Sequence, residues 1–476
     1  MLSLGFWNLL IVGLVALLLR SFWKLDDEKA IFKASTFLKH PLIQQLSRFC
    51  RKPLVNFLLQ ALVVFIVTRL LIFTGWTVYT LIRPNPPFWD FKVFYMASQL
   101  AHHHLSPFNV ENLNFLYPPN ILPLILPLSY FSINTAFTIW TVIHLFTIGF
   151  ILWGANLLLD SKSRAFRTVC TIMCALIYGL VFDMRAGNIS SFLAALLIWT
   201  VLLAKNGRNA TAGVLLGIAA IKPTLSILFI PYFLLKKRFS LVFWCIATTL
   251  VLASIGLTIS GSSVTDFWED FTQGLSLFFQ DRSNNPYLSP SRIDLMVIGP
   301  RFFPDSPRVA KIISDLMVGV LIGGISAYLY KKQASSSWSS TIYLSEVALI
   351  SCLSISINYS QETTSVMLIP AVVFLLNYLL FEIKYRQFSW MRMSLWLSGV
   401  FCLLAHTGLV YHWLLEPLGA AWKKGSLPYI LKITIGSVPN YALLVLTVNI
   451  LSLAALDLRQ KHSSAIETSA TRAQGN

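Results

Sequence analysis

The chain has 476 residues, of which 56% are hydrophobic, 13% aromatic and only 12% charged. Soluble proteins carry about 25% charged residues, so this composition excludes an ordinary water-soluble domain. Apolar runs of about 20 residues recur without the alternation and turn signals of an outer-membrane barrel, which predicts an all-α polytopic membrane protein.

The net charge of +17 does not indicate a nucleic-acid-binding protein. Membrane proteins collect Lys and Arg in their cytoplasmic loops, and no basic patch interleaved with aromatic residues remains once those loops are set aside. We therefore expect no nucleic-acid partner. The six cysteines lie in or beside apolar segments without His or acidic residues at ligand spacing, so we expect them to pack as small apolar side chains.

Residues 1–53 combine an apolar run near 4–20 with a polar linker. The run lacks a basic n-region and a small-residue cleavage site, so we interpret it as a retained anchor helix. The linker carries eight Lys and Arg residues against three acidic ones, which favours the cytoplasmic side. The N-terminus then lies outside.

The remaining apolar runs bring the expected total to about 12–13 membrane helices. They lie near 54–82, 134–158, 166–184, 188–205, 210–236, 239–260, 308–330, 341–358, 364–381, 393–413 and 438–457. From these runs we expect the chain to divide into 1–53, an anchor helix and basic cytoplasmic linker; 54–260, a membrane module with an outer loop at 83–133; 261–457, an outer loop and C-terminal membrane helices; and 458–476, a disordered cytoplasmic tail.

The run at 210–236 is flanked by basic loops that both look cytoplasmic, so a single crossing does not fit it. Lys222-Pro223 divides this run into two pieces of about 12 residues, each about 18 Å long against a hydrocarbon core of about 30 Å. Proline favours the break, because it removes a backbone donor and disfavours helix just before it. We expect two short helices that rise from the cytoplasm and return, with Lys222 in a pocket open to the outer side.

Four prolines make residues 118–131 a poor spanning helix, and we expect this segment along the outer interface. With these choices 24 Lys and Arg residues fall inside and 12 fall outside, while Arg69 lies within a helix. The C-terminus is then cytoplasmic. The large loops at 83–133, 261–307 and 414–437 all lie on the outer face, which places the chemistry there.

Asp90 lies at the outer mouth of a membrane helix, in the aromatic stretch "FWDFKVFY". A carboxylate there is suited to general base catalysis, since partial desolvation raises its pKa. An acid that reaches water beside an aromatic belt fits the same residues. The residues alone leave both interpretations open.

Lys222 marks a polar cavity, because an ammonium at membrane depth costs about 3 kcal/mol or more unless it is paired or hydrated. It suits a phosphate, although an ion pair that only stabilises the helix break fits as well. Arg185 and Asp183, in "FDMRAGNIS", form either a second phosphate contact or a local salt bridge. Arg69 and Glu346 both lie in apolar runs and would pair if they meet.

Metal and nucleotide sites have no clear seat in the sequence. His102, His103 and His104 are consecutive and cannot all face one metal from a helix, so we predict neither a divalent metal nor another cofactor. No Gly-rich phosphate loop or Walker motif is present. The loop 261–307 mixes acids with arginines, which indicates a folded outer loop over a cavity.

Two blocks of sequence resemble a known family. Residues 90–128 contain "DFKVFYMA", "SPF" and "FLYPP", and residues 186–235 contain "AGNIS" and "GVLLGIAAIKP". In this order and separation they resemble glycosyltransferase family 87 (DUF2029), the polyprenyl-phosphate-mannose-dependent mannosyltransferases. The resemblance implies a GT-C-like glycosyltransferase fold for the module at 54–260, with Asp90 as the catalytic acid of the first outer loop and Lys222 as the lysine of the K-P motif.

One region departs from the family pattern. The family often shows an S-x-x-W-x-H-H stretch before a late helix, whereas this chain reads "INYSQETTSVMLIP", with Glu362 and Thr363 near the histidine positions. The resemblance therefore predicts the fold better than the acceptor or the donor sugar.

The resemblance implies inverting transfer of a sugar, with mannose expected, from a polyprenyl monophosphate donor to a lipid-linked or glycan acceptor on the outer face of a bacterial inner or plasma membrane. Asp90 would deprotonate the acceptor hydroxyl, and Lys222 with Arg185 would bind the donor phosphate and its growing charge. The expected partners are that donor, a glycan or glycolipid acceptor, and membrane lipid. Supporting roles are expected for Tyr95, Asp183, Asn188 and Tyr117.

Two other interpretations remain. A transporter or flippase of a lipid-linked or small anionic substrate also suits many helices and a buried lysine. Transporters often carry broken helices in corresponding halves, and this sequence shows one clear break without a counterpart, which weighs against that class. An inactive scaffold of an envelope or glycolipid assembly system fits an intact Asp90 too.

Overall fold

The protein is described by a computed structural model. It covers residues 89–108, 115–159, 177–280, 292–335, 343–358, 360–385 and 443–448, together with Val110, Leu113, Arg167, Thr171, Cys174, Ala175, Asn285, Asn440, Ile450 and Leu451. The chain divides into two compact units, Met1–Pro86 and Pro87–Asn476, and all of these residues belong to the second. The expected anchor helix, basic linker and tail lie outside the described residues.

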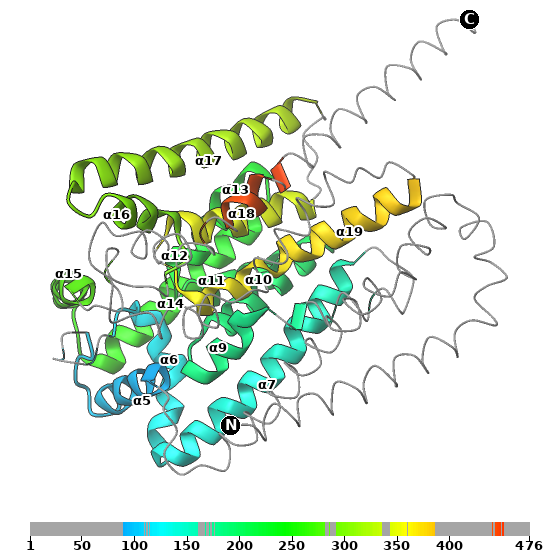
Figure 1. Ribbon diagram of the computed structural model, residues 1–476. Helices are drawn as coiled ribbons and strands as arrows, with labels where there is room; N and C mark the ends of the chain where they lie inside the picture. The colour runs from blue at the N-terminus through cyan, green and yellow to red at the C-terminus, as the bar shows by residue number, and fades with distance from the viewer. Residues whose placement is uncertain are drawn as a thin grey trace, which may run out of the picture. The chain divides into compact units, whose positions relative to one another are not determined.

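The second unit is built from helices, which confirms the all-α class. Within the described residues the only β-type pairing is an isolated bridge between Arg292 and Gln361. The elements in chain order (Figure 1) are α5 (Trp89–His102), η1 (Pro119–Ile121), α6 (Leu122–Ile125), η2 (Leu126–Tyr130), α7 (Ile133–Leu158), α9 (Tyr178–Ala186), α10 (Ser190–Lys205), α11 (Asn209–Ala219), α12 (Pro223–Ser226), α13 (Phe229–Leu235), α14 (Phe239–Ser260), α15 (Val264–Gln280), η3 (Leu295–Val297), α16 (Ile298–Phe302), α17 (Pro307–Ser335), α18 (Leu344–Ile357), η4 (Glu362–Leu368) and α19 (Ile369–Tyr385).

Three helices in the described part of the chain are long and apolar enough to cross a membrane. They are α7, α14 and the Pro307–Lys331 part of α17. Each matches an apolar run predicted from the sequence. Large apolar side chains on their outer surfaces are exposed, as expected of helices that face lipid. Shorter apolar helical stretches of 10–17 residues are Ser190–Lys205, Asn209–Ala219, Pro223–Leu235, Leu344–Ile357 and Thr363–Tyr378.

The predicted helix break at Lys222-Pro223 is present. Helix α11 ends at Ala219, and α12 begins at Pro223, which occupies the first helical position, where its missing N–H costs nothing. The second half of the predicted hairpin is divided again, into α12 and α13. Helix α11 packs between α10 and α14, so the break is held inside the helical unit.

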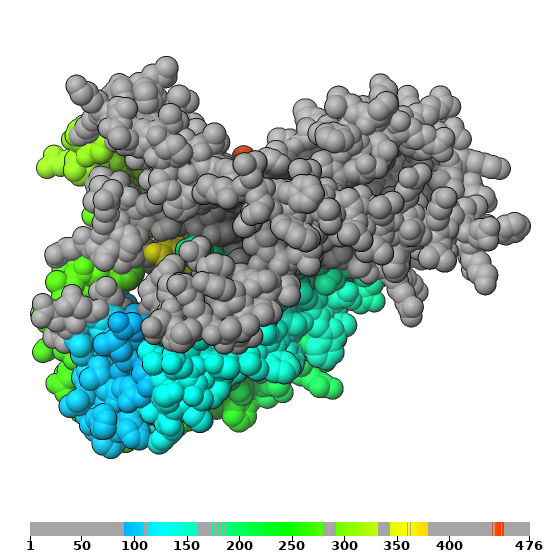
Figure 2. All heavy atoms as spheres, turned by 60° about the horizontal axis from the view of Figure 1, so that its bottom comes forward, coloured from blue at the N-terminus to red at the C-terminus, as the bar shows by residue number. Residues whose placement is uncertain are grey.

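The proline-rich segment at 118–131 forms three short pieces and no spanning helix, as predicted. Its α6 and η2 pieces pack against α5, and in Figure 2 the blue surface of α5 adjoins the cyan surface of the residues that follow it. The Tyr95 hydroxyl donates to the Phe131 carbonyl at 2.9 Å, and Gln99 donates to the Ser129 carbonyl at 2.9 Å. On the other side, η1 packs so closely on α14 that Gly256 faces the Pro119 carbonyl with no room for a side chain.

Glu346 has partners other than the arginine considered from the sequence. The Tyr232 hydroxyl donates to its Oε2 at 2.9 Å, and the Lys236 ammonium donates to its Oε1 at 2.9 Å. This buried carboxylate therefore links the end of α13 to the first turn of α18. Arg69 lies outside the described residues, so its own pairing stays untested.

The Gly256 contact predicts a position-specific loss of stability. A Cβ at Gly256 would lie 1.9 Å from the Pro119 carbonyl oxygen, so Gly256→Ala forces backbone apart and should destabilise the fold by about 1–3 kcal/mol. Gly149→Ala is the matched control, because Gly149 also lies inside a candidate span and nothing lies within 4 Å of its added Cβ. Thermal unfolding in detergent should show a lower melting temperature only for Gly256→Ala. Equal melting temperatures would contradict this packing.

Candidate active site

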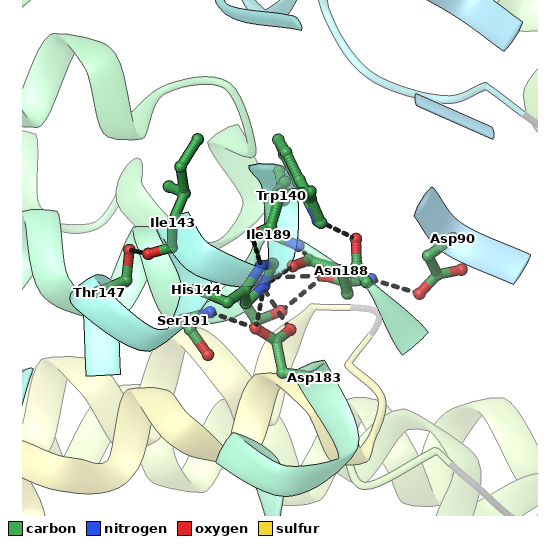
Figure 3. A network of polar contacts seen from close by, with 11 residues as sticks. Asp90, Trp140, Ile143, His144, Thr147, Asp183, Asn188, Ile189 and Ser191 are labelled. Carbon is green, nitrogen blue, oxygen red and sulfur yellow. Dashed lines mark hydrogen bonds and ion pairs between the residues drawn. The ribbon is translucent and has the colours of Figure 1, made fainter. Parts of the chain in front are cut away.

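Asp90 makes one direct side-chain contact that links two distant parts of the sequence. It lies in the first turn of α5, and its Oδ2 accepts a 2.7 Å hydrogen bond from the Asn188 amide Nδ2 (Figure 3). Asn188 belongs to the short turn that joins α9 to α10. The contact brings the two sequence blocks, 90–128 and 186–235, together at one point.

The orientation of the Asn188 amide is set by its oxygen. Oδ1 accepts from the Ile189 N–H at 2.7 Å, from the Ser190 N–H at 3.1 Å and from the Ser190 hydroxyl at 3.0 Å. Three donors therefore surround Oδ1, and this fixes which end of the amide is oxygen. The Nδ2 group is left to point at Asp90.

Asp183 holds the same turn from inside. Its side chain is fully buried, and its two oxygens accept from the Ser190 N–H at 3.1 Å and the Ser191 N–H at 2.8 Å. These are among the N–H groups that lack partners at the start of a helix, and a carboxylate there is favoured by the helix dipole. These two contacts make Asp183 a cap on α10. Arg185 belongs to α9, but its side chain lies outside the described residues.

Gly187 allows α5 to approach this turn. Its φ of +69° is the left-handed conformation that ends α9, and glycine adopts it without strain. A Cβ at this position would lie 2.6 Å from the Phe91 Cβ. The absent side chain therefore leaves room for the residue next to Asp90, which brings the carboxylate within reach of Asn188.

Two side chains of α7, Trp140 and His144, complete the support and were not singled out from the sequence (Figure 3). Trp140 Nε1 donates to the Gly187 carbonyl at 2.9 Å. His144 Nε2 lies 2.7 Å from the Asn188 carbonyl and 3.5 Å from Asp183 Oδ2. Their spacing of four residues places both on one helix face. A histidine within an apolar run is the sequence signal that could have indicated this polar role.

Asp90 is half-buried and its carboxyl is hard to ionise. Desolvation by the surrounding protein raises its pKa to about 6, while the Asn188 hydrogen bond and then the Lys222 charge act in the opposite direction, and the Asp183 charge adds a smaller increase. The positive charge of Lys222 thus favours the ionised form of the Asp90 carboxyl. The Asp90 and Lys222 side chains each keep some exposed surface.

The predicted supporting tyrosines shape α5 and its surroundings. The Tyr95 hydroxyl is used by the Phe131 carbonyl, so it anchors α5 and takes no part in the Asp90–Asn188 contact. The Tyr117 ring packs against Phe94, one helical turn after Asp90, with centroids 5.0 Å apart.

The segment that departs from the family pattern lies beside the helix break. The Asn358 amide donates to the Thr224 carbonyl, two residues after Lys222. The next residues are held by a buried ion pair from the loop 261–307, in which Asp294 binds Arg292 at 2.8 Å and accepts from the Ser360 N–H at 3.2 Å. Thr363 is buried, with no hydrogen-bond partner for its hydroxyl, and the Glu362 side chain lies outside the described residues.

An apolar groove of about 570 Å³ lies beside the turn that carries Asn188. Its walls come from η1 and α6, from α7, from α10 with Ile189 before it, and from α11 with Ile221 two residues after its end. The lining is Ile121, Leu124, Ile125, Trp140, Ile143, Thr147, Phe150, Ile189, Phe192, Ala195, Leu196, Trp199, Leu215, Ile218 and Ile221. Ile189 and Ile221 directly adjoin Asn188 and Lys222 in the chain. Exposed Ile143 and Phe150 show that the groove opens along the outer surface of α7.

Two of the three consecutive histidines, His102 and His104, contact residues from other segments of the chain. The His102 ring packs edge-on against Tyr130, and His104 Nδ1 lies 3.1 Å from the Ile259 carbonyl. Within the described ranges no group of three or more His, Cys, Asp or Glu side chains could hold a metal ion.

The Asn188 contact predicts a shift in the pKa of Asp90. Asn188→Asp keeps the oxygen that caps the turn but replaces the donor with a second carboxylate, and two such groups cannot easily ionise together. The pair should therefore hold a proton to a pH above about 6, the present pKa of Asp90. The infrared band of the protonated carboxyl, followed against pH, measures this shift. Ser191→Ala, at the start of α10 and with no hydroxyl partner among the described residues, should leave the titration unchanged.

The comparison with protein families identifies the chain. The model of glycosyltransferase family 87 matches residues 115–356, about half of the chain, and a comparison with curated proteins found no matching relative. The matched range contains Asn188 and Lys222, whereas Asp90 precedes it and is connected to it through the Asn188 hydrogen bond. The chain therefore belongs to glycosyltransferase family 87 and is a membrane glycosyltransferase.

Proposed function

We propose that the protein transfers a sugar, with mannose expected, from a polyprenyl monophosphate to a glycan or glycolipid acceptor. The observation that carries this proposal is that Asn188, which binds Asp90, and Lys222 directly adjoin Ile189 and Ile221 of the apolar groove. A base, a cation and an apolar channel are what a reaction between a sugar hydroxyl and a prenyl-linked phosphate needs.

The groove supports a lipid-linked donor. Thr147 supplies the one hydroxyl among its lining side chains, so the groove offers little to a sugar and much to a hydrocarbon chain. Its open side lies on α7, a candidate membrane span, and a prenyl chain would enter there from the bilayer without crossing water. The phosphate at the head of that chain would then lie near Ile189 and Ile221, beside Asn188 and Lys222.

The proposed reaction is a single displacement. Asp90 takes the proton of the acceptor hydroxyl, whose oxygen attacks the anomeric carbon, and the bond from that carbon to the phosphate oxygen breaks. The departing phosphate gains negative charge, which the Lys222 ammonium stabilises. Attack from the side opposite the phosphate inverts the anomeric centre. Arg185 remains a proposed second phosphate contact.

The ends of the candidate spans support an outward-facing site. Lys236, Lys237 and Arg238 precede α14, whose other end contacts the loop after α5 through Ile259 and His104, and Lys331 and Lys332 lie at the end of α17. Such residues collect on the cytoplasmic side of a membrane, which would put Asp90 outside. An N-terminus outside and a C-terminus in the cytoplasm complete this proposed topology.

Asp90→Asn is the direct test of the base. Asparagine keeps the shape but cannot accept the hydroxyl proton, so sugar transfer should fall by about 100- to 10,000-fold. In the parent, the ionised carboxylate is the active form, and the rate should rise with pH through about 6 and fall as the pH drops below it. The assay uses purified protein with radiolabelled polyprenyl-phosphate mannose and a membrane glycolipid extract, over a range of pH.

Ser191→Ala provides the matched control, because it alters the first turn of α10 beside Asn188 without removing a described side-chain contact. Transfer by Asp90→Asn at more than a tenth of the parent rate would remove Asp90 from the mechanism. A parent protein that moves the labelled lipid across a vesicle membrane without transferring its sugar would favour the transporter interpretation.

A further inference from the structure

Helix α15, which the reaction does not use, has two different faces. One face packs on the loop after α5: Phe267 contacts Phe108 edge-on with ring centroids 4.8 Å apart, and Asp270 accepts from the Ser106 hydroxyl at 3.0 Å. Next to this face is an apolar strip formed by Val264, Trp268 and Leu275. Val264 is 69% and Trp268 is 63% exposed, so no described part of the chain covers the strip.

The strip is part of a continuous pattern on the helix. Val264, Trp268 and Leu275 are four and seven residues apart, which places them on one line along the surface. Thr265, Glu269, Thr272 and Ser276 are exposed on the adjoining side. An exposed apolar line bordered by polar residues is typical of a helix that lies at the surface of a membrane.

A sharp corner fixes α15 at the end of a membrane-crossing helix. Helix α14 ends at Ser260, and Gly261, with φ of +64°, terminates it in the left-handed conformation. Ser263 and Asp266 then cap each other's backbone N–H groups, which starts α15 within three residues of Gly261. A helix needs about 20 residues to cross the hydrocarbon core, and α14 has 22, so its end lies at the interface. Helix α15 starts there.

The direction of α15 and its surroundings agree with this position. Figure 1 shows α15 nearly end-on while α7 and α17 run lengthwise across the view, so α15 crosses the direction of the candidate spans. Exposed aromatic residues also flank the neighbouring spans at the same end: Tyr130 and Phe131 before α7, and Phe302 and Phe303 before α17. Aromatic side chains gather at this level of membrane proteins.

We propose that α15 is an interfacial helix, with the strip of Val264, Trp268 and Leu275 inserted into the lipid surface on the Asp90 side of the membrane. The adjoining face then holds the loop of Ser106 and Phe108, so the bilayer itself supports the chain that leads to the proline-rich segment. Asp266 and Glu269 remain in water. This binding surface for lipid is separate from the groove assigned to the donor.

Spin labels at two adjacent residues test the proposal. Trp268→Cys and Glu269→Cys, each in the full-length protein in lipid nanodiscs, place a nitroxide on the strip and on the polar side of the same helix. Trp268 is mostly exposed, so its replacement removes little packing. The parent protein, whose described cysteines Cys174, Cys245 and Cys352 are buried, is the labelling blank.

Collision rates with oxygen and with a water-soluble nickel chelate give the depth of each label. The proposal predicts that the label at 268 lies about 5–10 Å below the headgroup boundary and favours oxygen, whereas the label at 269 favours nickel. Equal access to nickel at both positions would overturn it. A label at 268 shielded from both reagents would overturn it as well, because the strip would then be covered by protein. Neither result depends on sugar transfer, so the outcome is independent of the proposed reaction.

Discussion

The fully buried carboxylate of Asp183 is the interaction on which the site depends. It accepts from the first two N–H groups of α10, and so it joins the end of α9 to the start of α10 across the turn at Gly187 and Asn188. A buried charge is tolerated only when donors satisfy it, and here the backbone provides them. Loss of this carboxylate would remove the described partner of the Ser191 N–H, leave the Ser190 N–H with Asn188 Oδ1 alone, and loosen the turn that carries Asn188.

The turn that carries Asn188 also orients the side chain of Asp90, the proposed base. The Asn188 oxygen is occupied by donors of its own turn, so its Nδ2 group points at Asp90, and Trp140 and His144 hold the carbonyls of the same turn from α7. The helices that hold the turn, α7 and α10, also form walls of the apolar groove. One set of helix contacts therefore positions both the polar end of the site and the channel beside it.

Features set by local sequence could be predicted, whereas contacts between distant segments could not. The spans at α7, α14 and α17 follow from apolar length, and the break before Pro223 follows from the geometry of proline. The sequence could not show that Glu346 meets Lys236, because residues 110 positions apart come together only through packing. It also gave no reason to connect His144 with Asp183, although a polar residue in an apolar run was a usable signal.

In the proposed reaction the donor's phosphate lies beside Asp90 and Lys222, with its prenyl chain in the groove. A polyprenyl phosphate that carries a photoreactive diazirine on its first isoprene units tests this most directly, with the cross-linked peptides identified by mass spectrometry. We expect labels on the groove faces of α7, α10 and α11, around Ile143, Leu196 and Ile218. Unlabelled polyprenyl phosphate should remove these labels by competition. Labels confined to the outer surfaces of α14 and α17, unaffected by competitor, would contradict it.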